Sequence, residues 1–254
     1  MVVRRRTLAA GAIAGVALLA AGCSGGGEDD LLVFAASSLT SAFAEIESEF
    51  EAQNPAVDVV VSFAGSSALR EQLLDGAPVD VFASANFANI ATLRDAGLVD
   101  GTGTPFATNA LTVSVPSGNP ADVSGIADFA NSDLAIGLCA QDVPCGLAAI
   151  EVLEVFEVDA SVDTFEPNVA ALAARLAEGE LDSALVYETD VIASSGRLES
   201  LGLGERREVR LDYSVIALNS STHVADADAF VDFLSSVQGQ EILAEHGFGP
   251  GVAR

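Results

Sequence analysis

Small hydroxyl-bearing residues follow two apolar segments, each at the point where a helix is expected to begin. Ser38 lies in "VFAASSLT", and Ser66 lies in "SFAGSSALREQL". Two more helices are expected to begin in "VPCG", at Cys145, and in "PNVAAL", at Val169. The first turn of a helix leaves backbone N–H groups without intrahelical acceptors and carries a partial positive charge. Several such helix starts around one cleft would bind an anion without any cationic side chain.

Each of these residues also fits an ordinary structural role. A serine at a helix start is commonly an N-cap. Tyr187, at the end of the apolar segment "SALVY", also fits the role of a core tyrosine with a paired hydroxyl. The four helix starts are divided between two halves of the chain, and this division favours ligand binding over capping alone.

The sequence holds no motif of a common enzyme class. It has no Gly-x-Ser-x-Gly elbow, no P-loop, and no Gly-x-Gly-x-x-Gly after a strand. Its two histidines, His223 and His246, lie late in the chain, near the terminal helices. A serine hydrolase would need a base facing Ser38 or Ser66, and neither histidine lies near a strand end that could supply one. We therefore predict a protein that is not an enzyme and needs no cofactor.

Strand-like and helix-like segments alternate along the chain, which is typical of an α/β fold. Two long strands, near 108–115 and 211–219, bracket the second series of segments. The chain is expected to leave one α/β lobe, build another, and return to finish the first, so that the two crossing strands form a hinge beside a cleft. The predicted lobes are 31–112 plus 217–254 and 113–216. Strands are expected at 31–36, 57–64, 77–85, 109–116, 133–138, 183–187 and 211–220, and helices at 40–50, 86–97, 147–156 and 168–180, with one through 69–74 and two in 226–248, the latter separated near Gly239.

The N-terminal residues have the layout of an export signal. Three arginines precede a short apolar run that ends in "LLAAGC". This ending resembles a lipobox, so residues 1–22 are predicted to be a signal peptide, Cys23 to be lipidated, and residues 23–30 to form a flexible tether. The alternatives are an ordinary signal peptide or a membrane helix, for which the apolar run is short. The Arg-Arg-Arg-Thr-Leu start also resembles a twin-arginine signal.

The net charge and the cysteines limit which partners and which kind of cysteine site the protein is expected to have. The chain has 11 basic residues, all arginine, and 37 acidic residues; without three N-terminal arginines its formal charge is 8 − 37 = −29. Such a charge argues against nucleic acid or anionic lipid as a partner. Cys139 and Cys145 lie six residues apart with no histidine nearby. Outside the cytoplasm, this spacing favours a disulfide over a metal site.

Six segments, in order over nearly the whole mature chain, carry a family resemblance: "VFAASSLT", "SFAGSSALREQL", "GAPVDVFASAN", "VPCG", "PNVAAL" and "ALVYETDV". Together they resemble the periplasmic molybdate-binding proteins of ABC transporters. The resemblance implies a two-lobed periplasmic binding protein fold, type II-like, with a tetrahedral oxyanion held between the lobes by neutral donors. The implied donors are the hydroxyl and amide of Ser38 and Ser66, the amides of Cys145 and Val169, and the phenol of Tyr187. The metal is bound only as the oxyanion.

The resemblance also implies where the protein acts and with which partners. Molybdate, and tungstate with it, would be captured outside the cytoplasm by a monomer and delivered to an ABC permease. The lipid on Cys23 would be its only attachment to the cell membrane. The family usually has Ala at the position of Cys145, and because only the amide is used, Cys should serve as well. The alternatives are a binding protein for sulfate, phosphate or ferric iron, or a secreted serine hydrolase; a ferric site would need more tyrosines than Tyr187 and Tyr213.

Overall fold

The computed structural model describes residues 30–204 and 209–251. The predicted signal peptide, the lipidation site at Cys23 and almost all of the tether lie outside these residues. Within the described ranges, no helix is long and apolar enough to cross a membrane.

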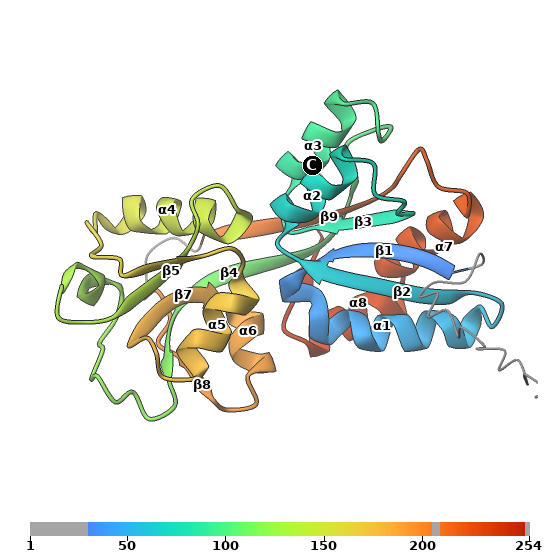
Figure 1. The fold of residues 1–254 in the computed structure, drawn as a ribbon. Coiled ribbons are helices and arrows are strands. Elements are labelled where there is room, and N and C mark those ends of the chain that lie inside the picture. Colours follow the sequence, from blue (N-terminus) through green and yellow to red (C-terminus); the bar gives the residue numbers. More distant parts are fainter. Residues whose placement is uncertain (1–29, 205–208, 252–254) are drawn as a thin grey trace, which may run out of the picture.

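Helices and strands alternate through most of the chain (Figure 1). The strands are β1 Asp30–Ala36, β2 Asp58–Ala64, β3 Val81–Ser84, β4 Thr104–Pro116, β5 Ile136–Cys139, β6 Thr164–Glu166, β7 Ser183–Tyr187, β8 Leu198–Ser200, β9 Arg210–Ala217 and β10 Gly249–Pro250. The α-helices are α1 Thr40–Gln53, α2 Ser66–Leu74, α3 Phe87–Asp95, α4 Pro144–Phe156, α5 Val169–Ala177, α6 Glu188–Ala193, α7 Val224–Ser235 and α8 Val237–Glu245, and the 3-10 helices are η1 Ser37–Leu39 and η2 Ile126–Ala130.

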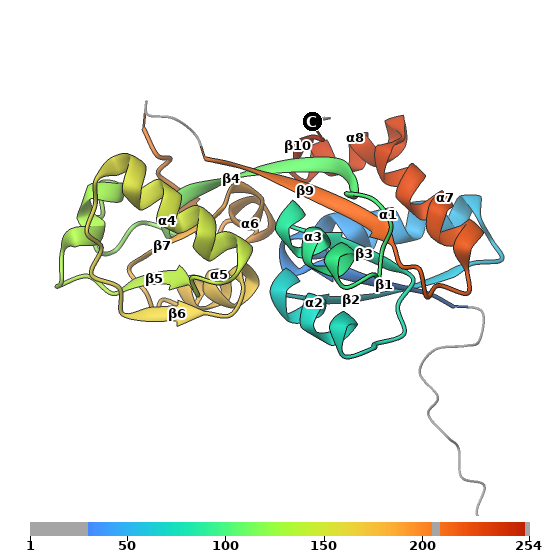
Figure 2. The same cartoon turned by 90° about the horizontal axis from the view of Figure 1, so that it is seen from above.

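One strand is shared by two sheets and joins two lobes. The strand order is β2-β1-β3-β9-β4-β7-β5-β6. The first half of β4 pairs antiparallel with β9, and residues 111–114 pair with β7. Figure 2 shows β4 and β9 side by side along one edge of the molecule, with α4, β5, β6 and β7 on one side and the helices of the first lobe on the other. This is the predicted two-lobed α/β fold with two crossing strands.

Helices cover both faces of the first sheet because its strands are apolar on both faces. Val81 and Phe82, successive residues of β3, point to opposite faces and belong to separate apolar clusters. On one face, Phe43, Phe50 and Phe230 pack edge to face under α1 and α7. Buried aromatic rings contribute a large share of the free energy that stabilises a core. The helices packed on both faces therefore hold the strands of the first lobe, and their ends at the cleft, in place.

Several predicted boundaries were wrong. β3 is shorter than predicted and β4 begins five residues earlier, at Thr104 rather than 109. The tail helices separate at Ser236, whose hydroxyl caps α8, while Gly239 lies inside α8. A Cβ at Gly239 would lie 2.2 Å from the Phe233 carbonyl oxygen, so this glycine permits close packing and does not mark the break. The short elements β6, β8 and α6 were not predicted.

Candidate functional site

A small cavity of about 20 Å³ lies between the lobes. All five residues predicted as ligand donors line it, three from the second lobe and two from the first. None of the described residues that line it is charged. The lining set is Ala36, Ser37, Ser38, Gly65, Ser66 and Ala85 from the first lobe, and Val143, Pro144, Cys145, Asn168, Val169 and Tyr187 from the second.

Three helices begin with residues that line this cavity, at Ser66, Pro144 and Val169. In α2 the first backbone bond is donated by Leu69 to Gly65, so the amide of Ser66 precedes any intrahelical bond. In α4 and α5 the first such donors are Leu147 and Leu172. The amides of Cys145 and Val169 therefore also lack intrahelical acceptors, and the partial positive charge of each helix start faces the same space.

The start of α5 is shaped by Asn168. Its Oδ1 accepts a hydrogen bond from the Ala171 N–H at 2.9 Å and so caps the helix. The cap uses the amide of Ala171 and leaves that of Val169 for the cavity. At α4, Pro144 is the first helical residue, where its fixed φ suits the helix and its missing N–H costs nothing.

Neither serine is an N-cap. Gly65 holds the N-cap position of α2, and no side chain caps the helix. The Ser66 Oγ instead accepts a hydrogen bond from the Ala85 N–H at 3.1 Å, so its own proton is left for donation. The Ser38 Oγ lies 2.8 Å from the Tyr213 hydroxyl. The N-cap positions of η1 and α1 are held by Ala36 and Leu39, so Ser38 is not a cap either.

The hydroxyl of Tyr187 distinguishes between a core residue and a ligand donor. The residue is 1% exposed, and within the described part of the chain its hydroxyl has no hydrogen-bond partner. Burial raises the pKa of Tyr187 well above its ordinary value, with smaller contributions from Tyr213 and Asp190, so the phenol stays protonated. A buried unpaired hydroxyl costs about 1–3 kcal/mol. The interpretation of Tyr187 as a core residue with a paired hydroxyl is therefore wrong, and its phenol is a free hydrogen-bond donor on a residue that lines the cavity.

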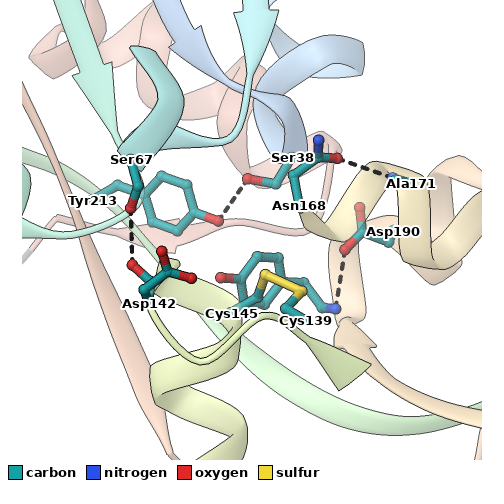
Figure 3. The surroundings of a disulfide bond; sticks show 10 residues. Ser38, Ser67, Cys139, Asp142, Cys145, Asn168, Ala171, Asp190 and Tyr213 are labelled. Atoms are coloured by element: carbon teal, nitrogen blue, oxygen red, sulfur yellow. Dashed lines mark hydrogen bonds between the residues drawn. A yellow bond between two sulfur atoms is a disulfide. The ribbon is translucent and has the colours of Figure 1, made fainter. Parts of the chain in front are cut away.

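A disulfide bond, drawn in yellow in Figure 3, ends at Cys145, which lines the cavity. It joins Cys139, the last residue of β5, to Cys145 in the first turn of α4. The loop between them is tight, since a Cβ at Gly146 would lie 1.8 Å from the Ala140 carbonyl oxygen. Among the described residues, no group of three His, Cys, Asp or Glu side chains could hold a metal ion. The disulfide fixes the chain that presents the Cys145 amide.

The two lobes contact each other around the cavity. Ser67, in α2, donates to the Asp142 carbonyl oxygen of the disulfide loop at 3.1 Å (Figure 3). Across the same boundary, a Cβ at Gly65 would lie 2.9 Å from the Pro167 carbonyl oxygen, so only glycine fits there without displacement. The structure therefore represents a closed arrangement of the lobes.

One carboxyl group lies behind the donors. The Asp190 Oδ2 accepts from the Tyr187 N–H at 3.0 Å. Burial raises the pKa of Asp190 from 3.8 to about 7, against the lowering effect of that single bond. The same carboxyl group raises the pKa values of Tyr187 and Tyr213. An ionised Asp190 would therefore oppose negative charge in the cavity, and a neutral one would not.

The histidines lie away from this site. His223 precedes α7 and lies 3.4 Å from the Asp80 carboxylate, and His246 follows α8 and lies 3.1 Å from Glu45. Neither is among the described residues that line the cavity. The serines of the site therefore have no histidine base, and a serine hydrolase mechanism has no support in the geometry.

The fold and the site define a two-lobed solute-binding protein. The family model described as "Bacterial extracellular solute-binding protein" matches residues 31–249, and the chain belongs to this family. Its members are transport components that act outside the cytoplasm, which confirms the prediction that the protein is not an enzyme.

Individual relatives indicate which solutes similar proteins bind. The chain is 34% identical to the molybdate-binding protein ModA of Mycobacterium bovis over 222 residues, covering 87% of this chain and 85% of the relative. It is similar to the substrate-binding domain of a putative molybdenum ABC transporter from Clostridium difficile, with 27% identity, a TM-score of 0.66, and coverage of 88% and 99%. The sulfate-binding protein SubI of Mycobacterium tuberculosis shares the fold, with a TM-score of 0.77, 20% identity, and coverage of 88% and 87%.

Proposed function

We propose that this protein captures molybdate, and also tungstate, between its lobes and delivers the oxyanion to an ABC permease. The observation that carries the proposal is the buried, unpaired Tyr187 hydroxyl in an uncharged cavity lined by helix starts. The other proposed donors to the anion are Ser38, Ser66, Cys145 and Val169. The 34% identity to ModA supports the choice of molybdate among tetrahedral anions.

Neutral donors are sufficient for tight binding. A hydrogen bond to a charged group contributes about 1.5–3 kcal/mol. About seven donors, counting the hydroxyl and amide of both serines, give roughly 10–20 kcal/mol before the costs of closure and ordering are subtracted. The remainder corresponds to a Kd between about micromolar and nanomolar. No cationic side chain is required.

The arrangement of donors also accounts for selectivity. Fixed backbone amides cannot move inward to reach the shorter bonds of sulfate, so part of the donor set would be left unpaired in a dry site, at a cost of about 1–3 kcal/mol each. Tungstate is nearly the same size as molybdate and should compete. Phosphate carries a proton at neutral pH, and that proton needs an acceptor.

The proposed transport cycle uses the two lobes as the moving parts. Because the anion contacts both lobes, it favours the closed form over the open one. We propose that the lobes are residues 31–112 plus 217–254 and residues 113–216; β9, at the second crossing, pairs with β3 of the first sheet. The protein would act as a monomer, held at the outer face of the cell membrane by a lipid on Cys23, so that the closed form meets its permease.

Thermal unfolding with four anions tests this proposal. A ligand at 100 times its Kd should stabilise the protein by about 2.7 kcal/mol. At equal concentrations, molybdate and tungstate should raise the melting temperature, and sulfate and phosphate should not. Stabilisation by sulfate without stabilisation by molybdate would instead assign the cavity to sulfate, in line with the shared fold of SubI.

A further inference from the structure

Tyr213 lies one step behind the proposed ligand site. It is in β9, is fully buried, and is not among the described residues that line the cavity. Its hydroxyl lies 2.8 Å from the Ser38 Oγ and 3.4 Å from the Asn109 Nδ2. Figure 3 shows the Tyr213 hydroxyl pointing at Ser38. Tyr213 therefore does not line the site itself, and the proposed donor to which its hydroxyl bonds is Ser38.

The direction of these hydrogen bonds follows from the backbone. The Ala110 N–H donates to the Asn109 side chain at 2.9 Å, so the atom that accepts it must be Oδ1. The amide nitrogen of Asn109 then faces Thr189 Oγ1 at 2.8 Å and the Tyr213 hydroxyl. An amide N–H can only donate, so the Tyr213 oxygen is the acceptor in this contact.

The chain of donors then ends in the cavity. The distance alone allows either hydroxyl to donate, but Ser38 Oγ, at 2.8 Å, is the acceptor placed for the Tyr213 proton, so we assign Tyr213 as the donor to Ser38. Among the described residues the Ser38 hydroxyl has no other hydrogen-bond partner, so its proton is left for the cavity. Burial raises the pKa of Tyr213 well above its ordinary value, so this phenol keeps its proton at physiological pH.

We propose that Tyr213 is a positioning residue that fixes the Ser38 hydroxyl as a donor to the bound oxyanion and thereby helps to exclude protonated anions. This inference rests on the proposed function. Ser66 is fixed in the same sense by the Ala85 N–H, so both serines present protons to the ligand. A hydrogen phosphate ion, which must donate a proton itself, finds no serine oxygen turned to receive it.

A double-mutant cycle with Tyr213→Phe and Ser38→Ala tests this role, with Kd values for molybdate and phosphate measured by calorimetry. Phe keeps the ring and its edge contacts with Phe106 and Phe248, so the packing is preserved. Tyr213→Phe should weaken molybdate binding by about 2- to 13-fold, the range of one neutral hydrogen bond. In the Ser38→Ala background the same change should have an effect within about twofold, because the residue it positions is gone.

Selectivity gives a second readout that a merely structural role would not move. Tyr213→Phe should lower the ratio of the phosphate Kd to the molybdate Kd, since the freed Ser38 hydroxyl can turn to accept. Thr112→Val is a matched control: it removes another buried hydroxyl from a hinge strand, one that bonds Ser200 and not Ser38, and it should leave the ratio unchanged.

Two results would overturn the inference: an equal loss of molybdate affinity in both backgrounds, or an unchanged selectivity ratio. Failure of the proposed function would look different, because the wild-type protein itself would not bind molybdate. If the wild type bound sulfate instead, the same cycle with sulfate should show the same loss of the Tyr213→Phe effect in the Ser38→Ala background.

Discussion

Replacement of Tyr187 by phenylalanine separates the role of its hydroxyl in ligand binding from any role in folding. The ring is buried and packs against Tyr213, and Phe keeps that packing. The hydroxyl has no partner in the described part of the protein. Its removal therefore breaks no hydrogen bond between described residues.

Removal of the Tyr187 hydroxyl should affect molybdate binding and the stability of the ligand-free protein differently. In the complex, an oxyanion oxygen loses its donor, so binding should weaken by about 1–3 kcal/mol, or about 5- to 160-fold. In the ligand-free protein the hydroxyl has no protein partner to lose, so the free energy of unfolding should be unchanged or higher. Tight binding and ligand-free stability are thus expected to change independently.

Calorimetric titration with molybdate and urea unfolding of the ligand-free protein measure these two quantities. Ser66→Ala is the comparison, because it removes both a proposed ligand donor and the acceptor of the Ala85 N–H. It should lower affinity and ligand-free stability together. A Tyr187→Phe protein with wild-type affinity and reduced stability would refute the argument, because the hydroxyl would then be a structural group.

The remaining predictions concern the serines, the carboxyl group behind the site, and the cysteines. Ser66→Ala should weaken molybdate binding by about 1–3 kcal/mol, and unchanged affinity in calorimetry would remove it from the site. Ser67→Ala removes the hydrogen bond between the lobes and should weaken binding by about 0.5–1.5 kcal/mol, mainly through faster dissociation in stopped-flow measurements; an effect confined to association would contradict a role in holding the lobes closed. The raised pKa of Asp190 contributes stability that is complete below 3.8 and is lost as the pH rises through about 7. Asp190→Asn should therefore flatten the urea-measured stability between these values, and an identical slope in both proteins would place the titration elsewhere. A thiol assay on the unreduced, unfolded mature protein should find no reactive cysteine, whereas two reactive thiols would disprove the disulfide.

Local sequence signals were enough to predict the frame of the site. Ser38 and Ser66 follow apolar strands within two residues, and the helices of Cys145 and Val169 begin at Pro144 and directly after Asn168. These signals act over a few residues, so one sequence suffices to read them. The same holds for the alternation of strands and helices that defines the two lobes.

Contacts between distant segments could not be predicted in this way. Tyr213 meets Ser38 across 175 positions because of strand pairing around β3 and β9, and the register of such pairing leaves no local signal. Ser67 and Asp142 are 75 positions apart and lie in different lobes, so their contact depends on how the lobes are placed. Strands of three residues, such as β6 and β8, are too short to show a period.

A crystal structure of the mature protein grown with molybdate is the most direct test of the central claim. Anomalous scattering would place the metal without ambiguity. We predict one peak in the cavity between the lobes, with the oxygens contacted by Ser38, Ser66, Cys145, Val169 and Tyr187 and by no charged side chain. A peak elsewhere, or an arginine in contact with the ion, would contradict an oxyanion site made of neutral donors.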